Sequence, residues 1–283
     1  MRLFETGDLA ALLRPRARRL SSSEVRRQAE LAALRMVGKY GHSTVSDLAA
    51  FLYPRGKCSI QSAQRLARRL IDRSPGLLAE RQNALGQRSL VLRRGGVAFL
   101  ELHGTHAHHG MDLASVTGPT FRHHAMTARF CQRQELLGVS AWSEYAIGLG
   151  QAVLLQKEVH ALCGKLPDAI LYTPGKETGP NALRGHIEAV EVEQAKKGTI
   201  SLARCLRLAE RACNGVCVRG HQLTGVVFVF DSNQAHESRI ARVAQSIWGA
   251  TERARFAKYV RLASVDLKPS LVFGEWKMNA LEI

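Results

Sequence analysis

Apolar residues recur at helical spacing through the first third of the chain. A serine run that leads into Glu24 marks the start of a first helix, and Gly41 marks its end. Thr44 precedes a second, short helix, and a third begins at Ser59 after a break that contains proline and glycine. We therefore expect three helices in this part of the chain.

The third helix has one apolar and one polar face. The apolar stripe comprises Ile60, Ala63, Leu66, Ala67 and Leu70. The polar face carries the candidate DNA contacts Gln61, Gln64, Arg65, Arg68 and Arg69. An alternative interpretation is the solvated basic face of an ordinary three-helix domain.

A two-stranded wing is predicted after the third helix. Short β-like runs at Leu77–Arg81 and Ser89–Arg93 flank a polar turn that contains glycine. Three helices followed by a wing are typical of a winged helix-turn-helix, whose third helix enters the major groove of DNA. We expect this domain at residues 21–101, with Arg93 and Arg94 as further candidate DNA contacts.

Residues 102–119 lack a sustained period and are rich in Gly, Ser, Thr and Pro, which predicts a linker. The segment also contains several histidines and one aspartate, at His103, His106, His108, His109 and Asp112. Clustered imidazoles can bind a transition metal, but a flexible loop does not supply the fixed geometry of a zinc site. A polar linker is therefore the expectation here.

From residue 120 onward, helical and strand patterns alternate. We expect helices at Phe121–Leu137, Thr199–Cys213 and Ser238–Trp248, and strands at Pro167–Tyr172, Gly185–Ala195, Leu223–Asp231 and Tyr259–Asp266. The run LTGVVFVFD is continuously apolar, which indicates a strand buried on both faces. The alternation predicts an α/β (α+β) domain at residues 120–283, with a mixed sheet flanked by helices.

Three acids in this second domain are candidate ligands. Glu191 and Glu193 lie two residues apart on one expected strand, so their side chains converge on one face. Asp168 follows Pro167 on another expected strand, and antiparallel pairing can bring it beside them. Such oxygen ligands suit Mg²⁺ or Mn²⁺, and the metal can activate water against a phosphodiester. A neighbouring lysine or simple exposure to water are the other ways to balance these charges.

The charge balance favours a polyanionic partner. The formal net charge is +16, and residues 1–101 hold 19 Lys and Arg against 8 Asp and Glu. A basic first third is the electrostatic footprint of a protein that binds a polyanion, and together with the expected winged helix it predicts double-stranded DNA as the partner. A membrane surface is the rival partner, but the arginines are scattered through apolar-periodic segments instead of forming one lipid-facing helix. No apolar run approaches the roughly 20 residues of a membrane span, so we expect no membrane partner. Six cysteines without framework spacing indicate buried free thiols in a reducing compartment, and hence a cytoplasmic location.

Two resemblances follow from these residues. Pro167-Asp168 together with EVEQAKK resembles the PD-(D/E)xK nuclease signature, which pairs an Asp with a Glu-x-Lys. Glu193 stands at the lysine position, and Lys197 is the candidate for a displaced lysine. The wider order of a winged helix ending in LVLRRGGVAFL, then FRHHAMTARF, WSEYAI, LPDAILY and AVEVEQAKKG, resembles the replication-relaxation family of MobC-like plasmid mobilisation proteins, from about residue 24 to 267.

The resemblance implies a winged helix followed by a restriction-endonuclease-like sheet, and a role in processing or regulating the DNA of mobile elements. It adds Glu144 as an accessory acid and metal ligand beside Asp168 and Glu191. One expectation is thus a Mg²⁺- or Mn²⁺-dependent endonuclease or nickase that uses Asp168, Glu191, Glu193, Lys197 and Glu144. The alternative is a non-catalytic DNA-binding regulator on the same fold. A third is an accessory subunit that needs a transfer or transposition complex.

Overall fold

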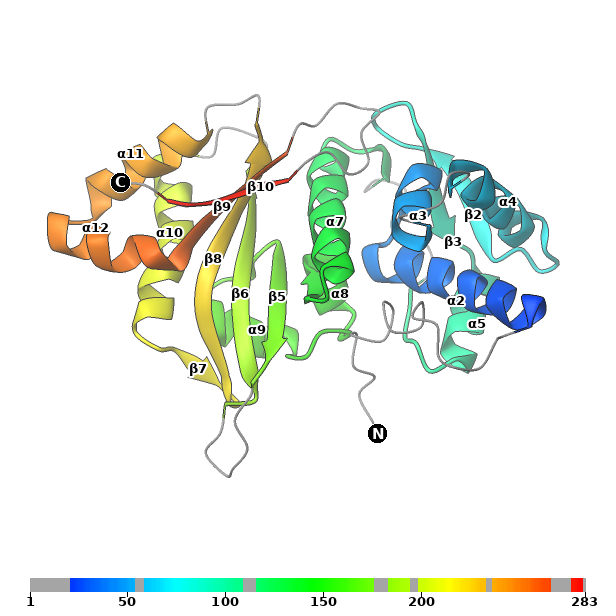
Figure 1. The fold of residues 1–283 in the computed structure, drawn as a ribbon, viewed down its shortest axis with the longest axis horizontal. Coiled ribbons are helices and arrows are strands. Elements are labelled where there is room, and N and C mark those ends of the chain that lie inside the picture. The colour runs from blue at the N-terminus through cyan, green and yellow to red at the C-terminus, as the bar shows by residue number, and fades with distance from the viewer. Residues whose placement is uncertain are drawn as a thin grey trace. The chain divides into compact units, whose positions relative to one another are not determined.

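The computed structural model describes residues 21–53, 59–108, 116–175, 183–193, 198–232, 236–265 and 276–281. The chain divides into two compact units, Met1–Gly138 (unit 1) and Val139–Ile283 (unit 2) (Figure 1). Both units combine helices with a β-sheet, so the predicted α+β class is confirmed. The predicted boundary at residues 119–120 differs from the observed division, which falls after Gly138.

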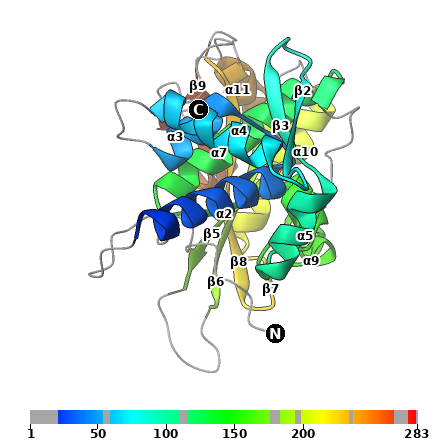
Figure 2. The same cartoon turned by 90° about the vertical axis from the view of Figure 1, so that its right-hand side faces the viewer.

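Unit 1 places helices beside a small antiparallel sheet. The helices are α2 (Ser22–Tyr40), α3 (Val45–Leu52), α4 (Ser59–Asp72), α5 (Arg94–Leu102) and α7 (Phe121–Leu136). The strands β1 (Ser43–Thr44), β3 (Arg88–Leu92) and β2 (Leu78–Gln82) pair in that spatial order. In Figure 2 the hairpin of β2 and β3 projects beyond helices α2 to α4.

Capping residues define where the first two helices begin. The Ser21 hydroxyl accepts a hydrogen bond from the Glu24 N–H, and the Glu24 carboxylate accepts one from the Ser21 N–H, which completes a capping box. Thr44 and Asp47 form the same reciprocal pair at the start of α3. Gly41 ends α2 with φ of 77°, a conformation that glycine adopts without strain. Both predicted helix starts are therefore confirmed.

Helix α4 is amphipathic as expected, with one exception. Ala63, Leu66, Ala67 and Leu70 are buried against the rest of unit 1. Ile60, which was expected in the same stripe, leaves 43% of its surface exposed. The stripe therefore begins one turn later than the sequence pattern predicts.

Helix α5 places two of the candidate DNA contacts, Arg93 and Arg94, outside the predicted wing. Strand β3 ends at Leu92, and Arg93 is the N-cap of α5, so Arg93 and Arg94 do not lie on the hairpin. Two glycines allow this helix to pack closely against the chain that precedes β2. A Cβ at Gly96 would lie 2.3 Å from the Leu77 carbonyl oxygen. The sequence RRGGVAFLE does not show a helix by pattern, because glycines are poor helix formers.

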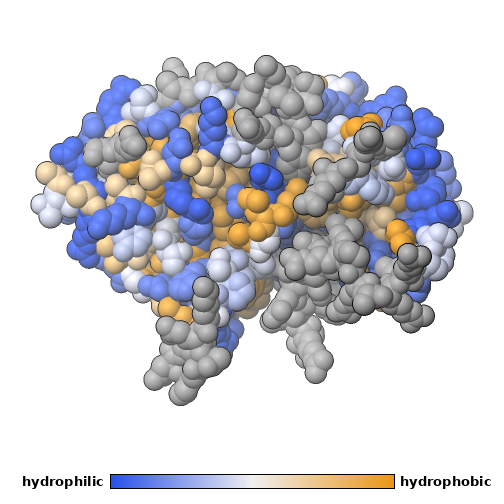
Figure 3. All heavy atoms as spheres, viewed as in Figure 1, coloured by the Kyte–Doolittle hydropathy of each residue, from blue (hydrophilic) through white to orange (hydrophobic). Residues whose placement is uncertain are grey.

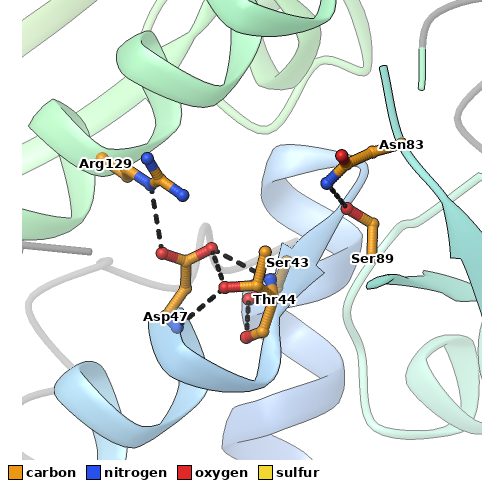
Figure 4. A network of polar contacts seen from close by, with 6 residues as sticks. All are labelled: Ser43, Thr44, Asp47, Asn83, Ser89 and Arg129. Atoms are coloured by element: carbon orange, nitrogen blue, oxygen red, sulfur yellow. Dashed lines mark hydrogen bonds and ion pairs between the residues drawn. The ribbon is translucent and has the colours of Figure 1, made fainter. Parts of the chain in front are cut away.

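Helix α7 belongs to unit 1 through buried polar contacts, although its sequence was assigned to the second domain. Arg129 of α7 donates through Nε to Asp47 of α3 at 3.2 Å, and both side chains are buried (Figure 4). Glu135 of α7 forms an ion pair with Lys39 and accepts a hydrogen bond of 2.8 Å from the Tyr40 hydroxyl. Buried charges need partners of this kind, and here each partner lies within unit 1.

The described parts of the predicted linker also pack within unit 1. Ala107 and Val116 are buried, and the Val116 carbonyl accepts a hydrogen bond of 3.0 Å from the Ala84 N–H. The His103 ring stacks on Phe99. The described part of this segment is therefore packed against unit 1 and is not an extended linker. His109 and Asp112 lie outside the described residues.

Unit 2 is built on a mixed sheet (Figure 1). Its strands are β10 (Lys277–Ala280), β9 (Val260–Val265), β8 (His221–Asp231), β6 (Gly185–Glu193), β5 (Ala169–Pro174) and β4 (Ser140–Ser143), in that spatial order, with β7 (Cys217–Val218) paired to β8. β4, β5 and β6 are antiparallel to one another, and β6, β8 and β9 are parallel. The central strand β8 is buried on both faces from Gly225 to Asp231, as its apolar run predicts.

The helices of unit 2 pack on one face of this sheet. They are α8 (Glu144–Gly148), α9 (Gln156–Cys163), α10 (Thr199–Cys213), α11 (His236–Ile247), α12 (Ala250–Phe256) and the short 3₁₀ helix η1 (Ala257–Tyr259). Alternate residues of β6 and β8, among them Ile187, Ala189 and Phe228, share a core with Leu202 and Leu206 of α10. Glu191 and Glu193 have the same parity as Ile187 and Ala189, so they point toward the α10 face.

The described cysteines form no disulfide bonds, which agrees with the expected free thiols. Their burial is less uniform than expected. Cys131, Cys163 and Cys205 are buried, but Cys213 is partly exposed and Cys217 is exposed.

Candidate functional site

The first candidate site is the exposed face of α4, which we call the α4 surface and define as Gln61, Gln64, Arg65 and Arg68. These four residues are exposed and recur at intervals of three and four, so they line one side of the helix. The opposite side is buried, which fixes this face outward. On the side shown in Figure 3 the surface over α4 is predominantly hydrophilic.

Arg69 lies at the margin of the α4 surface rather than within it. Its Nε lies 3.7 Å from a carboxylate oxygen of Glu30 on α2, and Arg73 reaches the other oxygen of Glu30 at 3.8 Å. Both arginines remain largely exposed, so these ion pairs are weak. Arg69 is nevertheless directed toward α2, unlike Arg65 and Arg68 of the α4 surface.

The hairpin adds exposed basic groups near its turn. Arg81 and Arg88 lie on β2 and β3, and Arg88 approaches Glu80 at 3.3 Å while remaining mostly exposed. The turn is held by Asn83, whose side-chain oxygen accepts hydrogen bonds from the N–H groups of Leu85 and Gln87. The Asn83 amide also donates to Ser89 Oγ at 2.9 Å (Figure 4). These bonds fix the tip of a projecting basic hairpin.

The second candidate site is a row of acids across the sheet of unit 2. Ser143 pairs with Ala169, and Ala169 pairs with Val190. Continuing both antiparallel registers by one residue places Glu144, at the start of α8, beside Asp168, just before β5, and Asp168 beside Glu191 of β6. The Glu144 N–H donates to the Asp168 carbonyl at 2.8 Å, which fits this register. The structure thus brings the three predicted acids to one edge of the sheet at the backbone level.

Glu191 is the most enclosed member of the row, with 0% of its surface exposed. Its Oε2 accepts a hydrogen bond of 2.6 Å from Lys165 Nζ and one of 3.1 Å from Cys205 Sγ. Lys165 Nζ also lies 3.5 Å from Cys205 Sγ. Three different elements meet here: the segment before β5, strand β6 and helix α10. Sequence reasoning identified Glu191 but missed both Lys165 and Cys205.

Asp168 and Lys165 are linked electrostatically as well as by position. Asp168 Oδ2 accepts a hydrogen bond of 2.7 Å from the Val192 N–H, which ties the Pro167-Asp168 turn to β6. Burial acts to lower the pKa of Lys165, but the charges of Glu191, Cys205 and Asp168 act in the opposite direction, and the net pKa lies above its ordinary value. The ammonium form of Lys165 is therefore favoured at this edge.

The remaining predicted site residues have different surroundings. Glu193 is buried, with 1% exposure, on the same face as Glu191. The Glu144 side chain is exposed at the first turn of α8. Lys197 lies outside the described residues.

The donor atoms of this row determine whether a divalent metal fits between them. Within the described residues, no group of three or more His, Cys, Asp or Glu side chains is placed to hold a metal ion. Glu191 Oε2 receives an ammonium and a thiol, and Asp168 Oδ2 receives a backbone N–H. The described side chains as arranged therefore do not fit a Mg²⁺ or Mn²⁺ centre, and the predicted metal stays a prediction.

Family models, curated proteins and solved structures all yield no match to this chain. Among the described residues, no helix is both long enough and apolar enough to cross a lipid bilayer. The class that the structure defines is therefore a two-unit α+β protein with an exposed basic helix in unit 1 and an acidic row in unit 2. Its function must be inferred from these residues.

Proposed function

We propose that the protein binds double-stranded DNA through unit 1, with α4 as the recognition helix and the β2–β3 hairpin as the wing of a winged helix-turn-helix. The observation that carries this proposal is the α4 surface, where two glutamines and two arginines face outward from a helix whose other side is buried. Arginine and glutamine are residues that contact phosphates and the base edges of the major groove.

The charge of the chain supports the same proposal. The net charge of +16 supplies long-range attraction to a polyanion. Arg81 and Arg88 on the hairpin extend the basic surface beyond α4. By the resemblance described above, the DNA would belong to a mobile element, and the protein would act in the cytoplasm as a regulator of its transcription or replication.

The test is fluorescence anisotropy with a labelled duplex between 50 and 200 mM salt. We expect Arg65→Ala with Arg68→Ala to weaken binding and to reduce the slope of log affinity against log salt by about 1.8, because each lost phosphate contact accounts for about 0.9. The control is Arg242→Ala with Arg239→Ala on α11 of unit 2, which removes the same charge. Equal affinity and slope for both pairs of variants would remove α4 from the interface.

The glutamines of the α4 surface test sequence recognition separately. Gln61→Ala and Gln64→Ala should lower the preference for the target over unrelated DNA by about 1–3 kcal/mol while leaving the salt slope unchanged. The target is first selected from a random duplex pool. A uniform loss on all sequences would instead indicate that the glutamines contact only the backbone.

A second candidate function is cleavage of a phosphodiester at the acid row of unit 2, as in PD-(D/E)xK nucleases with Mg²⁺ or Mn²⁺. The neighbouring backbone positions of Glu144, Asp168 and Glu191 favour it. It ranks second because the described side chains do not by themselves provide the ligands. Relaxation of supercoiled plasmid by the wild type, but not by Asp168→Ala, would support it; a transfer or transposition complex added to the assay tests for a required partner.

A further inference from the structure

The buried carboxylate of Glu191 requires a source of positive charge or hydrogen bonds. A carboxylate that leaves water entirely loses several kcal/mol of solvation unless partners replace the water. Lys165 provides an ammonium at 2.6 Å, within the range of charge-assisted hydrogen bonds, and Cys205 provides a thiol at 3.1 Å. Both donors bind the same oxygen, Oε2.

The position of Lys165 in the chain allows this contact. Gly164 ends α9 with φ of 76°, and the chain then turns toward β5. The Lys165 side chain is 34% exposed, so it extends from the surface inward to a carboxylate that water does not reach. An ammonium in this place neutralises Glu191 without any bound ion.

Asp168 lies beside Glu191 in the strand register, and its charge also acts to raise the pKa of Lys165. Asp168 and Glu191 are the two acids that a divalent ion would have to share at this edge of the sheet. A divalent ion bound there would lie within a few ångströms of a positive group, and the like charges would repel.

We propose that Lys165 is a built-in counter-cation of the Asp168–Glu191 pair, which occupies the place of a divalent ion and keeps Mg²⁺ and Mn²⁺ from binding. The buried Glu191 carboxylate then has its positive partner without a metal ion. This role does not depend on DNA binding by unit 1, and it opposes the second candidate function, because a site that excludes Mg²⁺ and Mn²⁺ does not cleave DNA through them.

The experiment is a titration of the full chain with Mn²⁺, in which electron paramagnetic resonance measures the free ion. We expect the wild type to bind Mn²⁺ weakly and Lys165→Met to bind one ion about tenfold or more tightly, as expected when a competing charge a few ångströms away is removed. Adding Asp168→Asn to Lys165→Met should abolish the gain. The matched control is Lys157→Met, an exposed lysine on α9 of the same unit.

Two results would overturn the proposal. In the first, the wild type already binds Mn²⁺ as tightly as Lys165→Met does, and Asp168→Asn in the wild type weakens that binding. The other is a folded Lys165→Met variant that binds no more Mn²⁺ than Lys157→Met does. Circular dichroism shows whether each variant is folded. If Lys165→Met is unfolded, Lys165→Gln replaces it, because the glutamine amide can still donate a hydrogen bond to Glu191. The same two results then decide the outcome. DNA binding is measured separately, so a failure of either proposal leaves the other standing.

Discussion

Acid should destabilise unit 1 through a single buried histidine. His42 follows the glycine that ends α2, is 3% exposed, and packs its ring against Phe121 of α7 with centroids 4.8 Å apart. Its Nδ1 is buried and has no hydrogen-bond partner among the described residues. Burial lowers the pKa of His42 from 6.5 to about 4; Arg129 and His124 act in the same direction, and Asp47 opposes them.

The sign and size of the effect follow from this pKa. Because the pKa is lower in the folded chain than in the unfolded chain, the unfolded chain takes up the proton first as the pH falls. The contribution of neutral His42 is complete above pH 6.5 and is lost progressively between pH 6.5 and pH 4. The difference between 6.5 and about 4, at about 1.4 kcal/mol for each pH unit, gives a loss of about 3.5 kcal/mol once the pH is below both pKa values.

The perturbation is His42→Leu, which is close in volume and does not titrate. Urea unfolding is followed by far-ultraviolet circular dichroism at pH 7.5, 6.0, 5.0 and 4.5, roughly spanning the two pKa values. Other groups titrate in both proteins, so the difference in unfolding free energy between wild type and variant isolates His42. Tryptophan fluorescence in the same samples reports unit 2 alone, because Trp142, Trp248 and Trp276 all lie there.

The wild type should lose about 2 kcal/mol or more relative to His42→Leu between pH 7.5 and pH 4.5, with no matching change in the tryptophan transition. A difference that stays constant across this range would refute the argument, because it would mean that His42 is as easily protonated in the folded chain as in the unfolded one.

Two further predictions concern the packing of unit 1. Arg129→Met should lower the unfolding free energy by about 3 kcal/mol, since it leaves buried Asp47 with only its Thr44 donors, and Asp47→Asn should recover part of the loss in the double variant. Urea unfolding measures both, and additive losses would contradict a direct pair. Gly96→Ala should lower the unfolding free energy by about 1–3 kcal/mol, because the added Cβ would lie 2.3 Å from the Leu77 carbonyl oxygen. Gly148→Ala, with nothing within 4 Å of the added Cβ, is the control, and equal thermal melting of both variants would contradict the predicted clash.

Local signals explain which parts of the fold the sequence predicts. The starts of α2 and α3 depend on capping residues within three positions of each other, so the pattern Ser-x-x-Glu or Thr-x-x-Asp suffices. The burial of β8 follows equally from its own apolar run. Helix α5 was missed because its glycines serve close packing against Leu77, a contact that local propensity does not encode.

The assignment of α7 and the counter-charge of Glu191 depend on pairs that are distant in the chain. Arg129 meets a carboxylate 82 residues away, and Lys165 meets one 26 residues away. A single sequence gives each charged residue but not its partner, because many registers place a lysine near an acid at similar cost. The strand pattern was enough to place Glu191 beside Asp168 and to require a balancing charge. The balancing charge on Glu191 comes from Lys165 because the turn at Gly164 directs the Lys165 side chain inward, and this turn is visible only in the structure.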